Sequence, residues 1–129
     1  MNILNFDDLL QAARSQPEPQ RLLMVFTAAE ASSASGGEAT GTLTPVLCVD
    51  KLPAEVADFA SLMQESRQTG QAWDIVFIGS LPGRANQPPN SDEAEQPLLM
   101  MVEAIRHGRI YNFLGFDAQG DVLQITGAG

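Results

Sequence analysis

The stretch that decides the fold is WDIVFIGSL, residues 73–81. Its centre is a short, unbroken run of β-branched and aromatic side chains. A continuous apolar run of this length is typical of a strand that is covered on both faces. The stretch therefore predicts a strand near the centre of a sheet that carries helices on one or both faces.

Further strands are predicted on both sides of this stretch. LLMVFT (residues 22–27) and LTPVLCV (residues 43–49) are two earlier apolar runs of strand length. After it, residues 110–117 and 122–125 flank the turn sequence DAQGD and predict a hairpin. The last of these strands is short and alternates apolar with polar residues, which is typical of a sheet edge.

Helical spacing of apolar residues predicts three helices between these strands. The first begins at Asn5, a good N-cap, and ends before the proline-rich SQPEPQ. The second has Pro53 in its first turn and extends to about Gln68. The third has Pro97 at its start or in its first turns, and Gly108 ends it.

The element order is therefore α-β-β-α-β-α-β-β, in one α/β domain covering residues 1–129 with a mixed sheet of about five strands. The two strand–helix–strand passages predict right-handed crossovers between parallel strands. Strands one and two, and strands four and five, are expected to be antiparallel neighbours. Small polar residues predict a flexible loop at residues 30–42 and a polar loop at 82–96.

The charge balance argues against two classes of partner. Seven basic and sixteen acidic side chains give a net charge of −9, which repels nucleic acids and anionic membranes. The start of the chain, MNILNFDDLL, has acids where a signal peptide is apolar, and no apolar run is long enough to span a bilayer. A single cysteine cannot form an internal disulfide. These features predict a cytoplasmic protein.

No catalytic, metal or cofactor site is predicted. A reactive thiol needs a cation, a histidine or a helix N-terminus in contact with it, whereas Cys48 lies inside a strand and is expected to be a small buried apolar residue. His107 is expected at a helix C-terminus, where the dipole favours its protonated form. The acids Asp92, Glu93 and Glu95 have the oxygen chemistry of a divalent cation site, but their position favours helix capping.

The ends of two predicted parallel strands suggest a ligand site. Ligands bind beyond the carboxyl ends of parallel strands in open α/β sheets. Adjacent strands would bring Asp50 and Lys51 close to Ser80, Gly83 and Arg84. Glycine backbone beside two cations predicts a site for a small anion or carboxylate.

A partner surface is the other possibility. The third helix contains LLMMV, from Leu98 to Val102, which is apolar on more than one side, and Met100 falls outside the inward stripe. Methionine is common on adaptable binding surfaces. In this interpretation, a protein partner or a second copy of the chain would bind to this helix or to the C-terminal edge strand. The alternative interpretation is that the helix is simply well buried in the core.

A resemblance to a known family is carried by the following segments: NFDDLLQAARSQPEPQRLLMVF, LCVDKLPAEVADFASLMQESRQ, WDIVFIGSLPGR, PLLMMVEAIRHGRI and FLGFDAQGDV. They resemble a family of short bacterial proteins, some of which are labelled ribonucleotide reductase alpha subunit. The resemblance implies a small bacterial cytosolic domain. The label conflicts with the chemistry, because such a subunit needs several redox cysteines and this chain has one.

The features together favour a non-catalytic binding or protein-interaction module. The alternative is a small-anion-binding enzyme or ligand-binding domain at the strand ends. In that alternative, Lys51 and Arg84 would hold the anion and Asp50 would act as a base.

Overall fold

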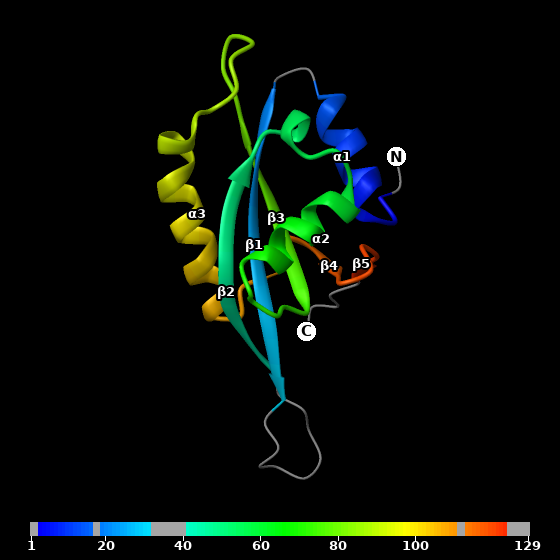
Figure 1. Ribbon diagram of the computed structural model, residues 1–129. Helices are drawn as coiled ribbons and strands as arrows, with labels where there is room; N and C mark the ends of the chain where they lie inside the picture. The colour runs from blue at the N-terminus through cyan, green and yellow to red at the C-terminus, as the bar shows by residue number, and fades with distance from the viewer. Residues whose placement is uncertain (1–2, 17–18, 32–40, 111–112, 124–129) are drawn as a thin grey trace.

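The computed structural model describes residues 3–16, 19–31, 41–110 and 113–123. Figure 1 shows its elements, and their order confirms the predicted one. They are α1 (Phe6–Arg14), β1 (Gln20–Ala31), β2 (Gly41–Lys51), the 3₁₀ turn η1 (Pro53–Glu55), α2 (Phe59–Gln68), β3 (Ile75–Pro82), α3 (Ser91–Arg106), β4 (Leu114–Asp117) and β5 (Val122–Leu123).

The sheet has the strand order β2-β1-β3-β4-β5, and every neighbouring pair is antiparallel. The antiparallel pairing of β1 with β2 and of β4 with β5 was expected, and β3 lies in the central position as predicted. The expected parallel crossover from β3 through α3 to β4 is wrong. β4 pairs only with residues 75–78, the first half of β3. The chain therefore enters β4 beside the middle of β3 and runs antiparallel to β3, toward the residue where β3 begins. β2 and β3 do point the same way, but β1 lies between them.

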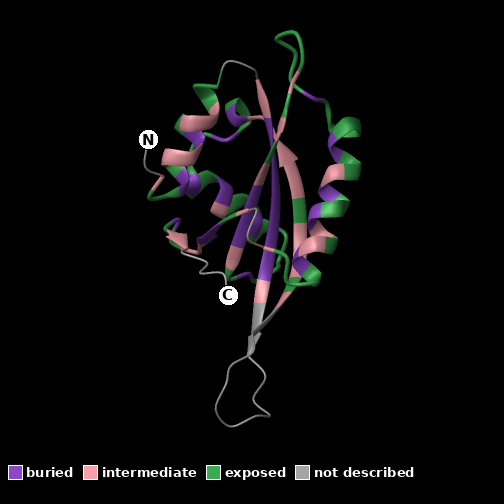
Figure 2. Ribbon diagram, turned by 180° about the vertical axis from the view of Figure 1, so that it is seen from behind, coloured by how far each residue is buried: buried purple, intermediate pink, exposed green. Residues whose placement is uncertain are grey.

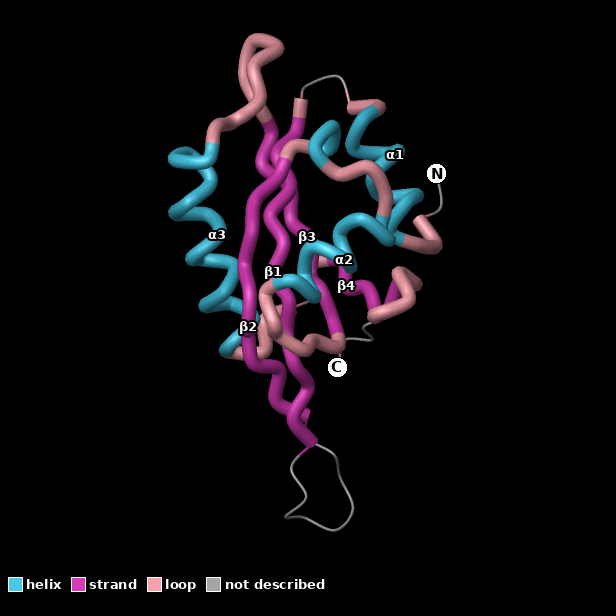
Figure 3. The backbone as a smooth tube through the Cα atoms, viewed as in Figure 1, coloured by secondary structure: helices cyan, strands magenta, loops and turns pink. Residues whose placement is uncertain are grey.

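Helices cover both faces of the sheet, with α3 on one face and α1 and α2 on the other (Figures 1 and 3). Along β1, Leu22 and Met24 pack into the cluster under α1 and α2, whereas Leu23 and Val25 pack under α3. β3 alternates in the same way. Successive residues of a strand point to opposite faces of the sheet, so a continuous apolar run contributes side chains to both cores. Figure 2 shows the central parts of β1 and β3 as buried.

Aromatic rings form the larger of the two cores. Phe6 of α1 lies 5.5 Å from the ring of Phe59 and 5.6 Å from that of Phe116. Trp73 packs edge-on against Phe26, with 5.0 Å between ring centroids, and its Nε1 donates a hydrogen bond to the Ser66 hydroxyl over 2.9 Å. Such tilted and edge-on pairs add to the stabilisation from burial alone.

Capping side chains decide where α2 and α3 start, and α2 starts later than predicted. α2 begins after Asp58, whose carboxylate accepts from the backbone of Ser61, and Pro53 lies instead in η1. α3 begins after Asn90, which forms a reciprocal capping box with Glu93. Of the two expected positions for Pro97, the one in the first turns of the helix is confirmed, and the polar segment ends at residue 90 rather than 96. Capping of this kind satisfies the free N–H groups of the first turn.

The expectation that Cys48 is buried is wrong, because the side chain is exposed on β2. β2 is an edge strand of the sheet, and a residue there lacks the second neighbouring strand that would enclose it.

The predicted loop at 30–42 lies for the most part outside the described residues, and its ends belong to β1 and β2. β5 lies at the other edge of the sheet as expected, although Ile125, the predicted end of that strand, lies outside the described residues. None of the helices in the described ranges is long and apolar enough to cross a membrane.

Candidate functional site

The two strand ends that were expected to form a ligand site are separated by β1. Leu22 of β1 pairs with Lys51 on one side and with Ser80 on the other. The expected adjacency of the two strand ends is therefore wrong. Hydrophobic patterns do not encode strand order, since the same apolar run suits any interior position.

Asp50 and Lys51 also point to opposite faces of the sheet. The Asp50 carboxylate contacts Ser91 at the start of α3, whereas Lys51 Nζ forms an ion pair with Glu65 of α2, with 3.1 Å between Nζ and Oε2. Neighbouring residues in a strand alternate in direction. The two side chains therefore do not line one site on the same face of the sheet.

The other predicted site residues divide between two cavities. Ser80 is exposed and lines an apolar groove of about 380 Å³ between α1 and the sheet. Gly83 and Arg84 line a separate cavity of about 230 Å³, together with Glu93. The structure thus brings Gly83 and Arg84 together and leaves Asp50, Lys51 and Ser80 elsewhere.

The loop beside this smaller cavity has a tightly defined backbone. A Cβ on Gly83 would lie 2.0 Å from the carbonyl oxygen of Gln87, so only glycine fits there. Arg84 and Gln87 exchange two backbone hydrogen bonds around Ala85 and Asn86, which have φ values of 51° and 64°. Two consecutive positive φ values are typical of a type I′ turn. The turn holds Arg84 at the cavity, where Glu93 supplies the opposite charge.

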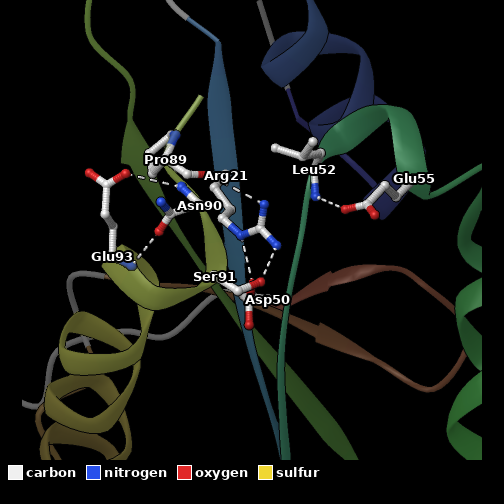
Figure 4. A network of polar contacts seen from close by, with 8 residues as sticks. All are labelled: Arg21, Asp50, Leu52, Glu55, Pro89, Asn90, Ser91 and Glu93. Atoms are coloured by element: carbon white, nitrogen blue, oxygen red, sulfur yellow. Dashed lines mark hydrogen bonds and ion pairs between the residues drawn. The ribbon is translucent and has the colours of Figure 1, made fainter. Parts of the chain in front are cut away.

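An arginine that the sequence did not single out organises this end of the sheet (Figure 4). Arg21 is 9% exposed. Its Nε donates to Asp50 Oδ2 over 2.6 Å, its Nη2 donates to Ser91 Oγ over 2.6 Å, and its Nη1 donates to the Pro89 carbonyl over 3.3 Å. Ser91 in turn donates to Asp50 over 2.8 Å. The network ties β1, β2 and the start of α3 together. The available signal was a lone arginine immediately before the apolar run of β1.

The network also sets the electrostatics of Asp50. Burial raises the pKa of this carboxyl, but the hydrogen bonds from Ser91 and Arg21 and the charge of Arg21 outweigh it, so the pKa lies below the ordinary value of 3.8. A carboxylate that binds a proton so weakly is a poor general base at neutral pH. Asp50 is suited to hold Arg21.

The lowered pKa of Asp50 predicts a specific loss of stability in acid. The stabilisation from this carboxylate is fully present above the unfolded value of 3.8 and is lost as the pH falls through the lower folded value. We expect the free energy of unfolding to fall more steeply in wild type than in Asp50→Asn as denaturation is followed from about pH 6 to about pH 3. Equal slopes would show that the network does not favour the carboxylate.

The other residues of chemical interest are separated from one another. His107 is the C-cap of α3, as predicted, and its Nε2 lies 3.5 Å from a Glu103 carboxylate oxygen. Asp92 and Glu93 lie in the first turn of α3, and Glu93 caps it as expected. Within the described ranges, no group of three or more His, Cys, Asp or Glu side chains is placed to hold a metal ion.

The outer face of α3 carries exposed apolar side chains. Leu99 is 52% exposed and Met100 is 65% exposed, whereas Leu98 and Met101 on either side are buried. The prediction that Met100 lies outside the inward stripe is confirmed.

The chain matches no protein-family model, no curated protein and no solved structure.

Proposed function

We propose that this protein is a non-catalytic interaction module that binds a protein partner through the outer face of α3. The observation that carries the proposal is the exposure of Leu99 and Met100, two large apolar side chains next to each other in the middle of one helix. Adjacent exposed apolar residues on a polar surface are a feature of protein-binding sites. Methionine adapts well to such contacts, because its side chain is flexible and polarisable.

Packing of α3 does not require these two side chains. The helix is anchored by a separate inward stripe, formed by Ala94, Leu98, Met101 and Ile105. Its start is held by the Arg21 network through Ser91. An exposed apolar residue that serves neither core nor cap contributes little to folding. Because folding does not account for Leu99 and Met100, we assign them a role in binding another molecule.

Site-specific photocrosslinking tests the proposal. A benzophenone side chain is placed at position 99 or 100 in the full chain, and at Gln64 on the exposed side of α2 as a control. We expect irradiation of native cells to give a discrete adduct from positions 99 and 100 and none from position 64. Equal adducts from all three positions, or none from α3, would contradict a binding face on this helix.

A second candidate function is binding of a small anion beside Arg84. It is favoured by the cavity that Arg84 lines, although its volume of about 230 Å³ is below the roughly 300 Å³ of most small-ligand pockets. In this case, an anionic metabolite should raise the midpoint of thermal unfolding, and Arg84→Ala should abolish the shift. No shift across a panel of anions would leave the interaction module as the supported function.

A further inference from the structure

Acidic side chains surround the exposed apolar pair on α3. Glu95 precedes Leu99 by four residues and Glu103 follows it by four, and both are exposed. Residues four apart are neighbours on a helix surface. Leu99 therefore lies between two carboxylates, and Glu103 is also a neighbour of Met100. Asp92 extends the row one turn further toward the start of the helix. We refer to Asp92, Glu95 and Glu103 as the acidic rim.

The acidic rim has little internal neutralisation. The only basic residue within α3 is Arg106, in its last turn. Glu103 contacts His107 at the helix end, but its side chain remains 61% exposed. Glu93 is not part of the rim, because its carboxylate caps the helix. The face thus combines two apolar side chains with carboxylates that have room for further partners.

The shape of this face fits a helix better than a small molecule. Its centre, Leu99 and Met100, lines none of the described cavities. Figure 1 shows α3 along one flank of the molecule, and the acidic rim, Leu99 and Met100 are all exposed. The helix has 16 residues, which corresponds to about 24 Å. A second helix laid along this flank would cover the apolar pair and reach the acids on either side.

Charge decides which occupant is favoured. Anionic lipids and nucleic acids are repelled by a chain with a net charge of −9. A second copy docking through the same face would bring two acidic rims together, and like charges across an interface oppose association. Lysine or arginine side chains at either end of an apolar stripe would complement the rim.

From this charge pattern we propose that the partner segment is a basic amphipathic helix of another protein, with its apolar stripe on Leu99 and Met100 and its cations on the acidic rim. The proposal rests on the proposed function and specifies the chemistry of the partner. Apolar contact supplies most of the affinity of such helices, and charge sets their orientation and salt dependence.

The test uses the full chain and a fluorescent amphipathic peptide of about 16 residues, built from leucine and lysine, in an anisotropy titration. One control peptide has glutamate in place of lysine, and a second has the same composition in an order without an apolar stripe. We expect the leucine–lysine peptide to bind at least about tenfold more tightly than either control. Raising the salt from about 20 mM to about 150 mM should weaken it severalfold.

Variants of the chain locate the binding face. The double variant Leu99→Gln/Met100→Gln should weaken peptide binding about tenfold or more, and Glu95→Gln/Glu103→Gln should weaken it and reduce its salt dependence. Leu4→Gln is the matched apolar control, since Leu4 is 66% exposed elsewhere. Glu65→Gln is the matched charge control on α2. Both controls should stay within about twofold of wild type.

Two outcomes separate the partner's chemistry from the function itself. Equal weakening by the control variants, or equal binding of the control peptides, overturns the basic amphipathic partner. If crosslinked adducts still form from positions 99 and 100, the interaction module remains and only the partner's chemistry is wrong. Absence of both adducts and peptide binding overturns both proposals.

Discussion

Replacing Arg21 with methionine should lower the free energy of unfolding by about 2–3 kcal/mol, less than the loss of one partner of a fully buried ion pair, because the Asp50 side chain is 21% exposed. Arg21 is almost fully buried, and all three of its bonding nitrogen atoms have partners. The variant removes the donor to the Pro89 carbonyl and leaves the Asp50 carboxylate with Ser91 as its one remaining side-chain donor. Urea denaturation followed by circular dichroism measures the change.

Two further variants test whether the loss comes from the unpaired groups. Removing both charges in Arg21→Met/Asp50→Leu should restore part of the stability, because apolar side chains can replace a buried pair at little net cost. Lys51→Met breaks the more exposed ion pair with Glu65, whose side chain is 55% exposed, and should change stability by less than about 1 kcal/mol. A similar loss in Lys51→Met and Arg21→Met would contradict the role given to the Arg21 network.

Gly120→Ala should destabilise the protein by about 2–4 kcal/mol, through backbone strain and overpacking together. Gly120 has φ +87°, which side chains other than glycine rarely adopt, and a Cβ there would lie 2.9 Å from the Phe59 ring. That ring is held between Phe6 and Trp73. The Gly120 carbonyl also accepts from the backbone N–H of Phe6 over 2.8 Å. The new methyl group would disturb the join between α1, α2 and the β4–β5 turn.

Gly108→Ala separates the two contributions. Gly108 has a similar φ of +76°, but a Cβ there has no neighbour within 4 Å. Gly108→Ala should therefore lower the free energy of unfolding by about 1 kcal/mol, from backbone strain alone. The difference between the two variants then measures the packing against Phe59. Equal losses would show that the ring moves aside freely.

The sequence predicted the elements well, because local patterns determine them. The apolar run of residues 22–27 indicated a strand covered on both faces, and its side chains do fill two separate cores. Gly108 correctly indicated the end of α3, because glycine adopts the positive φ that commonly follows a helix, and Gly108 has this conformation. Helix starts were less predictable, because two competing signals were present at α3. The Asn90 capping box determined its start, while Pro97 was accommodated inside the helix.

The candidate ligand site was predicted less well, because it depended on which strands are neighbours. Placing β1 between β2 and β3 separated Lys51 from Ser80. Asp50 and Lys51 are consecutive residues of β2, so their side chains point to opposite faces of the sheet. This could have been predicted from the sequence, because side chains alternate between the two faces along any strand. Arg21 was missed because a buried arginine is recognised only by the partners that surround it.

By itself, the amino-acid sequence determined the number and order of the strands and helices, the burial of the central strands on both faces and the negative charge of the chain. These properties follow from the spacing of neighbouring residues and from composition. Only the tertiary structure decided the strand order, the burial of Arg21 against Asp50 and Ser91, and the exposure of Cys48. Each of these depends on contacts between residues far apart in the chain, which local periodicity does not specify.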